Sequence, residues 1–197
     1  MLSTTRSRVR ALAVVGMAGV LAAVGAVTYQ ASAAEVAAPA APAAFGPESR
    51  QVAIPGIPKA IKPPKGARPL GAYLVTSGTQ TYKCTGGIFT GASTPEAQLV
   101  GTGGRIHHFG GPSWQSERDG SLVTATKVEP VSPRTGTIPE LLLKVAGHSG
   151  TGVLSKADYI NRLYTSGGVA PTTSCTAGQT VKVSYKAVYV FWDAPTA

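Results

Sequence analysis

The chain contains few cysteines, few acidic residues and little charge overall. Only two of its 197 residues are cysteine, too few for the sulfur ligands of most structural zinc sites. It has 9 acidic residues against 18 basic ones, and charged residues make up 14% of the chain, so the formal net charge is +9. Aromatic residues contribute 7%. Several of the positive charges lie in one short proline-rich run, residues 58–69.

Motifs for nucleotide chemistry are also missing. The glycine-rich stretch at residues 101–105 (GTGGR) does not form a G-x-G-x-x-G pattern that opens a helix, and no acidic residue follows it at the usual spacing. No phosphate-binding loop ending in Gly-Lys-Ser/Thr is present. We therefore expect no nicotinamide chemistry and no cofactor.

After the first 30 or so residues there is no long hydrophobic run. The run before that point follows Arg6, Arg8 and Arg10, extends from Ala11 to Val27, and ends at the small-residue site Ala31-Ser32-Ala33. This is the pattern of a secretory signal peptide. The competing interpretation is a retained membrane anchor. We predict a signal peptide over residues 1–34, a secreted protein that is extracellular or associated with the cell wall, and no stable membrane span after cleavage.

Residues 35–54 form an Ala/Pro-rich segment, which predicts a flexible linker. Four basic residues follow among prolines: Lys59, Lys62, Lys65 and Arg68. This run has no aromatic residues between its charges, unlike a nucleic-acid-binding face, so we predict no nucleic-acid partner. It suggests an extended, solvated arm. The alternative is an electrostatic anchor to an anionic cell-surface polymer.

Cys84 and Cys175 are the two cysteines. In an exported chain, two cysteines most simply form one disulfide. The bond would close a loop of roughly 90 residues, and chain-entropy arguments give it on the order of 4–5 kcal/mol.

Short runs rich in β-branched and aromatic residues, separated by Gly, Pro, Ser and Thr, predict a mainly β protein with little helix. The alternation is clearest in VKVSYKAVYVFW (residues 181–192), whose last part is apolar on both faces. Residues 154–168 are ambiguous between helix and strand, and we favour a strand. The expected fold is an antiparallel sandwich or barrel, forming a single compact domain over residues 55–193.

Six stretches in order carry a family resemblance. They are GTQTYKC (78–84), HHFGGPSW (107–114), DGS (119–121), IPELLLKV (138–145), YINRLYTSGGVAP (159–171) and VSYKAVYVFW (183–192). Together they resemble the secreted family called domain of unknown function 3455. The resemblance implies an exported, mostly β protein and supplies no mechanism. Where that family usually has Ile-Pro-Trp, this chain has Ile138-Pro139-Glu140.

The stretch GGRIHHFGGPSW (103–114) is the main candidate site. Trp114 can stack on a sugar ring, while Arg105, His107 and His108 can form hydrogen bonds with hydroxyl groups. The alternative is a structural turn, with Phe109 and Trp114 buried and one histidine hydrogen-bonded beneath them. The two histidines are a weak metal site, because neighbouring residues of a strand point to opposite faces. We predict no metal ligands.

Catalytic patterns are incomplete. GHSGTG (147–152) resembles a nucleophile elbow but has Thr151 where the turn needs glycine. Glu117 and Asp119 could serve as a carboxylate pair, but SERDGS (116–121) indicates a turn. We therefore assign no catalytic residue and predict a non-catalytic extracellular or cell-wall-associated binding module, with carbohydrate as the expected partner. The alternatives are an extracellular hydrolase acting on a polymer or ester, and a structural envelope protein.

Overall fold

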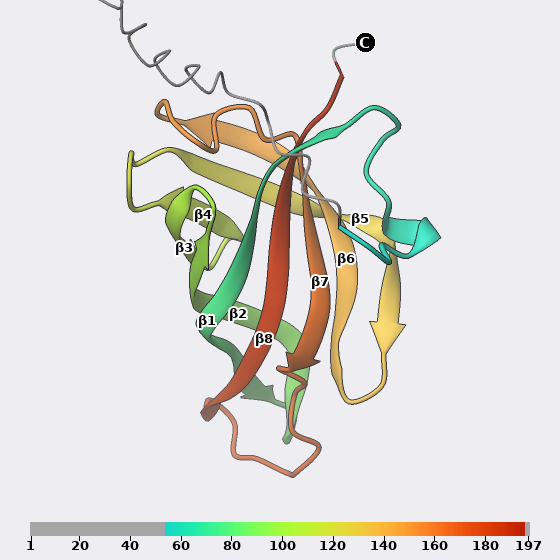
Figure 1. Ribbon diagram of the computed structural model, residues 1–197. Coiled ribbons are helices and arrows are strands. Elements are labelled where there is room, and N and C mark those ends of the chain that lie inside the picture. The colour runs from blue at the N-terminus through green and yellow to red at the C-terminus, as the bar shows by residue number, and fades with distance from the viewer. Residues whose placement is uncertain (1–53, 196–197) are drawn as a thin grey trace, which may run out of the picture. The chain divides into compact units, whose positions relative to one another are not determined.

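Eight antiparallel strands close into a barrel in the computed structural model (Figure 1). The structure describes residues 54–195, without the side chains of residues 91, 92, 129, 130 and 132. The predicted signal peptide and the linker up to residue 53 lie outside these residues. Within the described range, no helix is long and apolar enough to cross a membrane. The elements are η1 (Lys59–Ile61), β1 (Arg68–Thr85), β2 (Ile88–Gly101), β3 (Gly104–Phe109), β4 (Ser113–Ser116), β5 (Leu122–Arg134), β6 (Thr137–Ser149), β7 (Tyr159–Gly167) and β8 (Thr180–Asp193).

Each strand pairs with the next along the chain, and β1 pairs with β8 to close the barrel. The prediction of a mainly β, antiparallel fold is thus confirmed, as a barrel and not a sandwich.

The β1–β2 turn shows why a short connection is enough to join two neighbouring strands. Thr85 pairs with Ile88, and the two residues between them, Gly86 and Gly87, have φ values of 64° and 82°. Two-residue hairpin turns with positive φ at both positions match the twist of paired strands and favour glycine.

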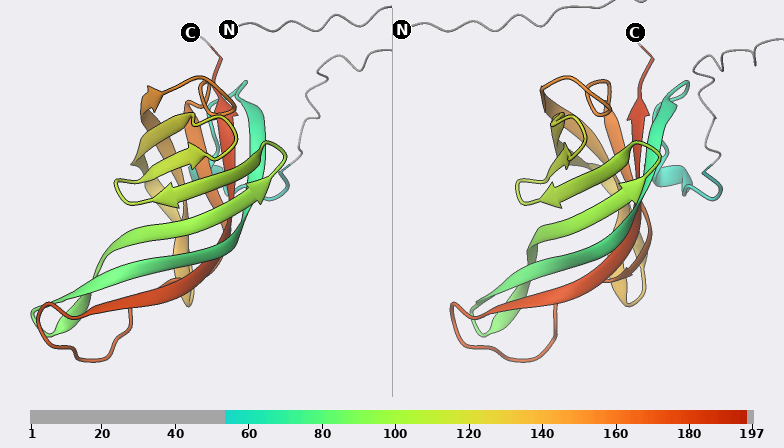
Figure 2. Two further views of the ribbon diagram at one scale, coloured as in Figure 1. Left: turned by 90° about the vertical axis from the view of Figure 1, so that its left-hand side faces the viewer. Right: turned by 60° about the vertical axis from the view of Figure 1, so that its left-hand side comes forward.

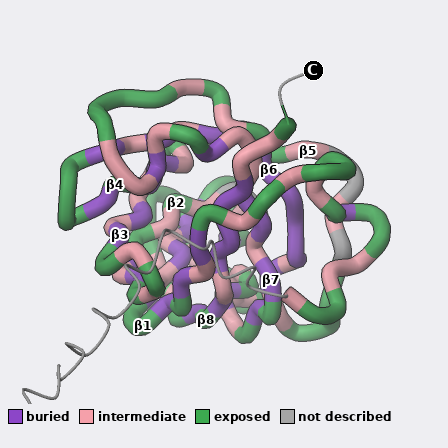
Figure 3. The backbone as a smooth tube through the Cα atoms, turned by 45° about the horizontal axis from the view of Figure 1, so that its top comes forward, coloured by how far each residue is buried: buried purple, intermediate pink, exposed green. Residues whose placement is uncertain are grey.

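Alternating side chains fill the barrel. On β8, Tyr185, Ala187, Tyr189 and Phe191 are buried and belong to the main core cluster. Exposed and buried positions alternate over residues 184–187 of this strand, and residues 189–192 are all buried (Figure 3). The apolar end of the last strand is therefore covered on both faces.

Residues 54–67, which we call the strap, cover the outer face of the barrel at the end of β8. Ile61 of the strap is fully buried against Leu163, Val190 and Trp192. The buried Asn161 side chain donates a hydrogen bond to the Ile61 carbonyl oxygen at 2.8 Å. The expectation of a solvated arm was therefore wrong for the backbone of this segment, because its isoleucines cover an apolar patch of the barrel, although its lysines are exposed.

Beyond the barrel proper, β1, β2 and β8 continue as a long ribbon (Figure 2). The predicted Cys84–Cys175 disulfide is present near the ribbon's end, with 6.0 Å between the Cα atoms. It joins β1 to the loop between β7 and β8. Cys84 packs with Tyr82 and Phe89 in a separate small cluster. The bond therefore stabilises a part of the fold that lies outside the main core.

Candidate functional site

The structure separates the four predicted site residues into two pairs. On β3, Arg105 and His107 face outward, whereas His108 is 2% exposed and faces the barrel interior. His107 Nε2 lies 2.6 Å from Glu96 Oε1 on the outer surface. Trp114 is the cross-strand partner of His108 and is 1% exposed. Arg105 and His107 therefore do not share a site with His108 and Trp114.

His108 and Trp114 form an aromatic cluster with Tyr189 of β8. The rings of His108 and Trp114 are stacked, with centroids 4.3 Å apart and planes 3° apart. Tyr189 meets both edge-on, at 5.1 Å and 5.7 Å. Phe109, which the turn interpretation had placed in the core, is only partly buried and packs on the His107 ring at 4.9 Å. Trp114 fits that interpretation, and Phe109 does not.

One hydrogen bond fixes the tautomer of His108. Its Nδ1 lies 2.8 Å from the Ser113 carbonyl oxygen. A carbonyl oxygen only accepts, so Nδ1 carries the proton. The pKa of His108 is lowered to about 4, mainly because the side chain is buried. The hydrogen bond to Ser113 opposes this shift, and the positive charge of Arg162 adds to it. At neutral pH the imidazole is therefore uncharged, and Nε2 holds a lone pair.

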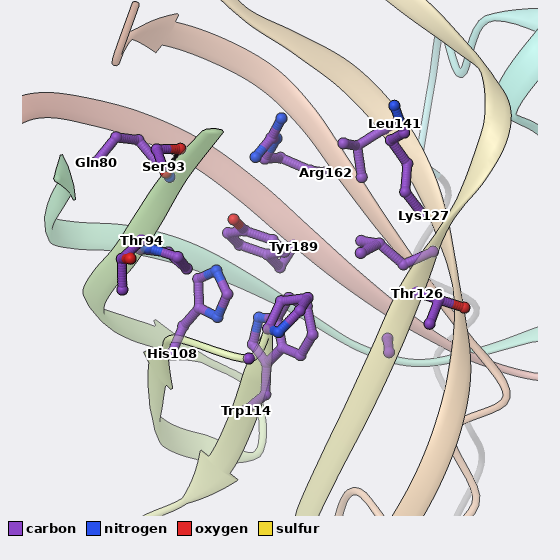
Figure 4. Close-up of a pocket in the computed structure, with 15 residues that line it drawn as sticks. Gln80, Ser93, Thr94, His108, Trp114, Thr126, Lys127, Leu141, Arg162 and Tyr189 are labelled. Atoms are coloured by element: carbon purple, nitrogen blue, oxygen red, sulfur yellow. Dashed lines mark hydrogen bonds between the residues drawn. The ribbon is translucent and has the colours of Figure 1, made fainter. Parts of the chain in front are cut away.

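A cavity of about 410 Å³ borders this cluster (Figure 4). His108, Trp114 and Tyr189 form its aromatic wall. The apolar part of the opposite side comes from Ala125 of β5 and from Leu141 and Leu143 of β6. The volume lies in the range of sites that enclose one small organic molecule. An eight-stranded barrel is just wide enough either to fill with side chains or to hold one such ligand.

The cavity opens on one side because two strands of the wall are short. β3 and β4 have 6 and 4 residues, between β2 with 14 and β5 with 13. The β4–β5 pairing extends only from Leu122 to Thr124 of β5. Beyond it, the lining residues Thr94, Gly111, Thr126 and Lys127 are exposed. They form the rim of the opening.

The barrel end away from the cavity is plugged by residues 150–158, which we call the closing loop. Its Leu154 is 1% exposed and belongs to the main core. Asp119 holds this loop: Oδ2 accepts the Val153 N–H at 3.0 Å, and Oδ1 accepts the Ser121 hydroxyl at 2.6 Å. The Ser121 hydroxyl, followed by the Val153 N–H, lowers the pKa of Asp119 to about 2. Asp119 is thus a structural residue of the predicted turn.

The polar lining of the cavity is rich in hydrogen-bond donors. Arg162 of β7 lies opposite Tyr189, and its Nε and Nη2 donate to the Pro139 carbonyl oxygen at 3.2 and 2.9 Å. Gln80 is 3% exposed, and its Oε1 accepts the Ser93 hydroxyl at 2.6 Å. Within the described part of the chain, Gln80 Nε2 and Trp114 Nε1 are buried without a partner. None of the described lining residues is acidic.

Hydrolytic and metal chemistry find little support in this arrangement. His148 is exposed, and its Nε2 lies 2.8 Å from the Ala157 carbonyl oxygen, not from a serine or carboxylate. The contact between His107 and Glu96 lies outside the barrel, away from the cavity. Among residues 54–195, no three His, Cys, Asp or Glu side chains gather as a metal site. The side chains that line the cavity offer hydrogen bonds and apolar contacts.

Sequence reasoning did not identify Gln80, Arg162 or Tyr189 as site residues. A signal for Arg162 existed: it alternates with Ile160 on the inward face of a strand, where a cation is rare. No comparable signal marked Gln80 or Tyr189, because their strands are far from the His-Trp hairpin in sequence.

A model of the family described as "Protein of unknown function (DUF3455)" matches residues 88–193. The matched segment runs from β2 to β8 and contains every residue of the cavity lining except Gln80. No curated protein and no solved structure matches the chain.

Proposed function

We propose that the chain, which belongs to the DUF3455 family of proteins of unknown function, is an exported, non-catalytic binding protein that encloses one small organic molecule in its barrel. The observation that carries this proposal is the side-opening cavity of about 410 Å³. Its aromatic wall and its buried, unpartnered donors at Gln80 and Trp114 suit a ligand with an apolar body and a polar head.

A small ligand has better support than a polysaccharide surface. Stacking on a polymer needs an open aromatic face, but Trp114 is 1% exposed and one of its faces lies against His108. Carbohydrate binding is therefore proposed only for short sugars that fit the cavity. Export is proposed from the N-terminal signal pattern, and the Cys84–Cys175 disulfide is consistent with it.

The proposal is tested by titrating the protein with N-phenyl-1-naphthylamine, a neutral dye whose fluorescence rises in apolar surroundings. We expect saturable binding of one dye molecule per chain. In Ala125→Phe, the added ring enters the cavity from β5, so binding should be lost. Ala146→Phe is the matched control, because Ala146 is an exposed strand residue outside the lining.

Both variants must show the same unfolding transition as the wild-type protein, so that loss of binding reports on the cavity. Failure of the wild-type protein to bind the dye, or equal binding by Ala125→Phe, would contradict the proposal. Short oligosaccharides added to the dye complex test the carbohydrate alternative, since a sugar that fits the cavity should displace the dye.

A further inference from the structure

From the arrangement of donors around the cavity we infer that its ligand is an aromatic carboxylic acid, bound through its carboxylate to Arg162. This inference rests on the proposed function, because it names the chemical class of the molecule in the same cavity.

The guanidinium of Arg162 is held in place with one edge unused. The Pro139 carbonyl oxygen accepts from both Nε and Nη2, so it occupies the Nε–Nη2 edge. The Nη1–Nη2 edge remains, with two parallel N–H groups. A carboxylate matches such an edge with two parallel hydrogen bonds, which is the strong and geometrically specific form of this contact.

The charge of Arg162 has no anionic partner in the described part of the chain, where it forms no ion pair. No described lining residue is acidic, and His108 is neutral at pH 7. The positive charge of Arg162 also contributes to the low pKa of His108. A cation in a partly enclosed site without a counter-charge favours an anionic ligand.

Two further donors are independent of Arg162. Gln80 and Trp114 line the cavity. The Nε2 atom of Gln80 and the Nε1 atom of Trp114 are buried and find no acceptor among the described residues. An unpaired buried donor costs about 1–3 kcal/mol, a cost that a ligand oxygen would remove. Figure 4 shows Gln80 and Arg162 projecting toward the same space, with Tyr189 below Arg162 in this view. The head of the ligand is therefore rich in acceptors.

The body of the ligand faces aromatic rings and aliphatic side chains. The stacked His108–Trp114 pair and the edge of Tyr189 lie on one side, and Leu141 and Leu143 on the other. Aromatic rings gain from edge-to-face and offset contacts with such a wall. An aromatic ring that carries a carboxylate satisfies both halves of the site.

The test compares 2-naphthoate with 2-naphthalenemethanol, which has the same ring system but no charge, by isothermal titration calorimetry at pH 7. We expect the acid to bind about ten- to hundred-fold more tightly than the alcohol, the usual range for a charge-assisted pair. Arg162→Met should remove this advantage and leave alcohol binding unchanged. Lys182→Met, which removes an exposed cation of β8 outside the cavity, should bind both compounds as wild type does.

Binding of the neutral dye separates the possible failures. If wild type binds the dye but prefers the alcohol or binds both compounds equally, the carboxylate inference is wrong while the proposed function stands. If wild type does not bind the dye, the proposed function itself fails. Should Arg162→Met not fold, Arg162→Lys keeps the charge but not the two-pronged edge, and an unchanged preference for the acid in that variant would overturn the role of the guanidinium.

Discussion

Lowering the pH should destabilise the fold through one buried imidazole, that of His108. The side chain is 2% exposed. Burial lowers its pKa from 6.5 to about 4, the hydrogen bond to Ser113 opposes this shift, and the charge of Arg162 adds to it. In the unfolded chain the pKa returns to its ordinary value. Between the two values the unfolded state binds more protons than the folded state, so stability falls as the pH falls.

The size of the effect follows from the shift. The difference between 6.5 and about 4 is about 2.5 pK units, and each unit corresponds to about 1.4 kcal/mol. The free energy of unfolding should therefore fall by about 3 kcal/mol between pH 6.5 and pH 4. This is a large fraction of the roughly 5–15 kcal/mol that stabilises a typical domain.

Urea unfolding followed by tryptophan fluorescence, at a series of pH values across this window, measures the effect. His108→Asn supplies a side chain that does not titrate but retains an N–H for the Ser113 carbonyl oxygen. It should be less stable than wild type at neutral pH and should lose most of the pH dependence. His107→Gln, on the outer surface, should keep the contribution of His108. If His108→Asn loses stability with falling pH as steeply as wild type does, the reasoning is refuted.

Three further predictions concern parts of the fold outside the cavity. Reducing the Cys84–Cys175 disulfide should lower the free energy of unfolding by about 4–5 kcal/mol, because it joins residues 91 apart; urea midpoints that agree with and without dithiothreitol would contradict this. Asn161→Leu should lower the free energy of unfolding by about 3 kcal/mol. The Asn161 amide donates to carbonyl oxygens of the strap and of β6, and it accepts the indole N–H of Trp192 in β8. A thermal melt that coincides with that of wild type would exclude such a role. Asp119→Ala should speed amide hydrogen exchange several-fold in the closing loop, because its carboxylate accepts a loop N–H; unchanged exchange rates at the Val153 and Leu154 amides would argue against it.

Much of the strand content was visible in the sequence, but not how the strands are divided. Gly71–Thr76 and Thr79–Cys84 each have the composition of a strand, and both lie in the single strand β1. Ser77 and Gly78, which separate them, are residue types typical of a turn. In the barrel they instead form an irregular stretch, where the register shifts against both β2 and β8. A bulge and a turn draw on the same residue types, so local sequence does not distinguish them.

Residues 159–167 show the opposite case, in which a weak preference for strand was correct. Ser155 and Asp158, just before this strand, resemble the start of a capping box, which favours a helix. In the structure Ile160 and Arg162 face the interior, while Asn161 and Leu163 face the strap. Both faces of β7 are covered, which hides the polar–apolar alternation expected of a half-exposed strand.

By itself the sequence determined the features that depend on short-range pattern: β strands from their period of two, one disulfide from two cysteines, and a turn between His108 and Trp114. The tertiary structure decided which of these residues share a site. Closure of β1 onto β8 brings Gln80, Arg162 and Tyr189 to the His108–Trp114 pair. The alternation of side chains along β3 leaves Arg105 and His107 on the outer surface of the barrel. The lengths of β3 and β4 then set the opening, because these short strands leave part of the barrel wall beside the cavity uncovered.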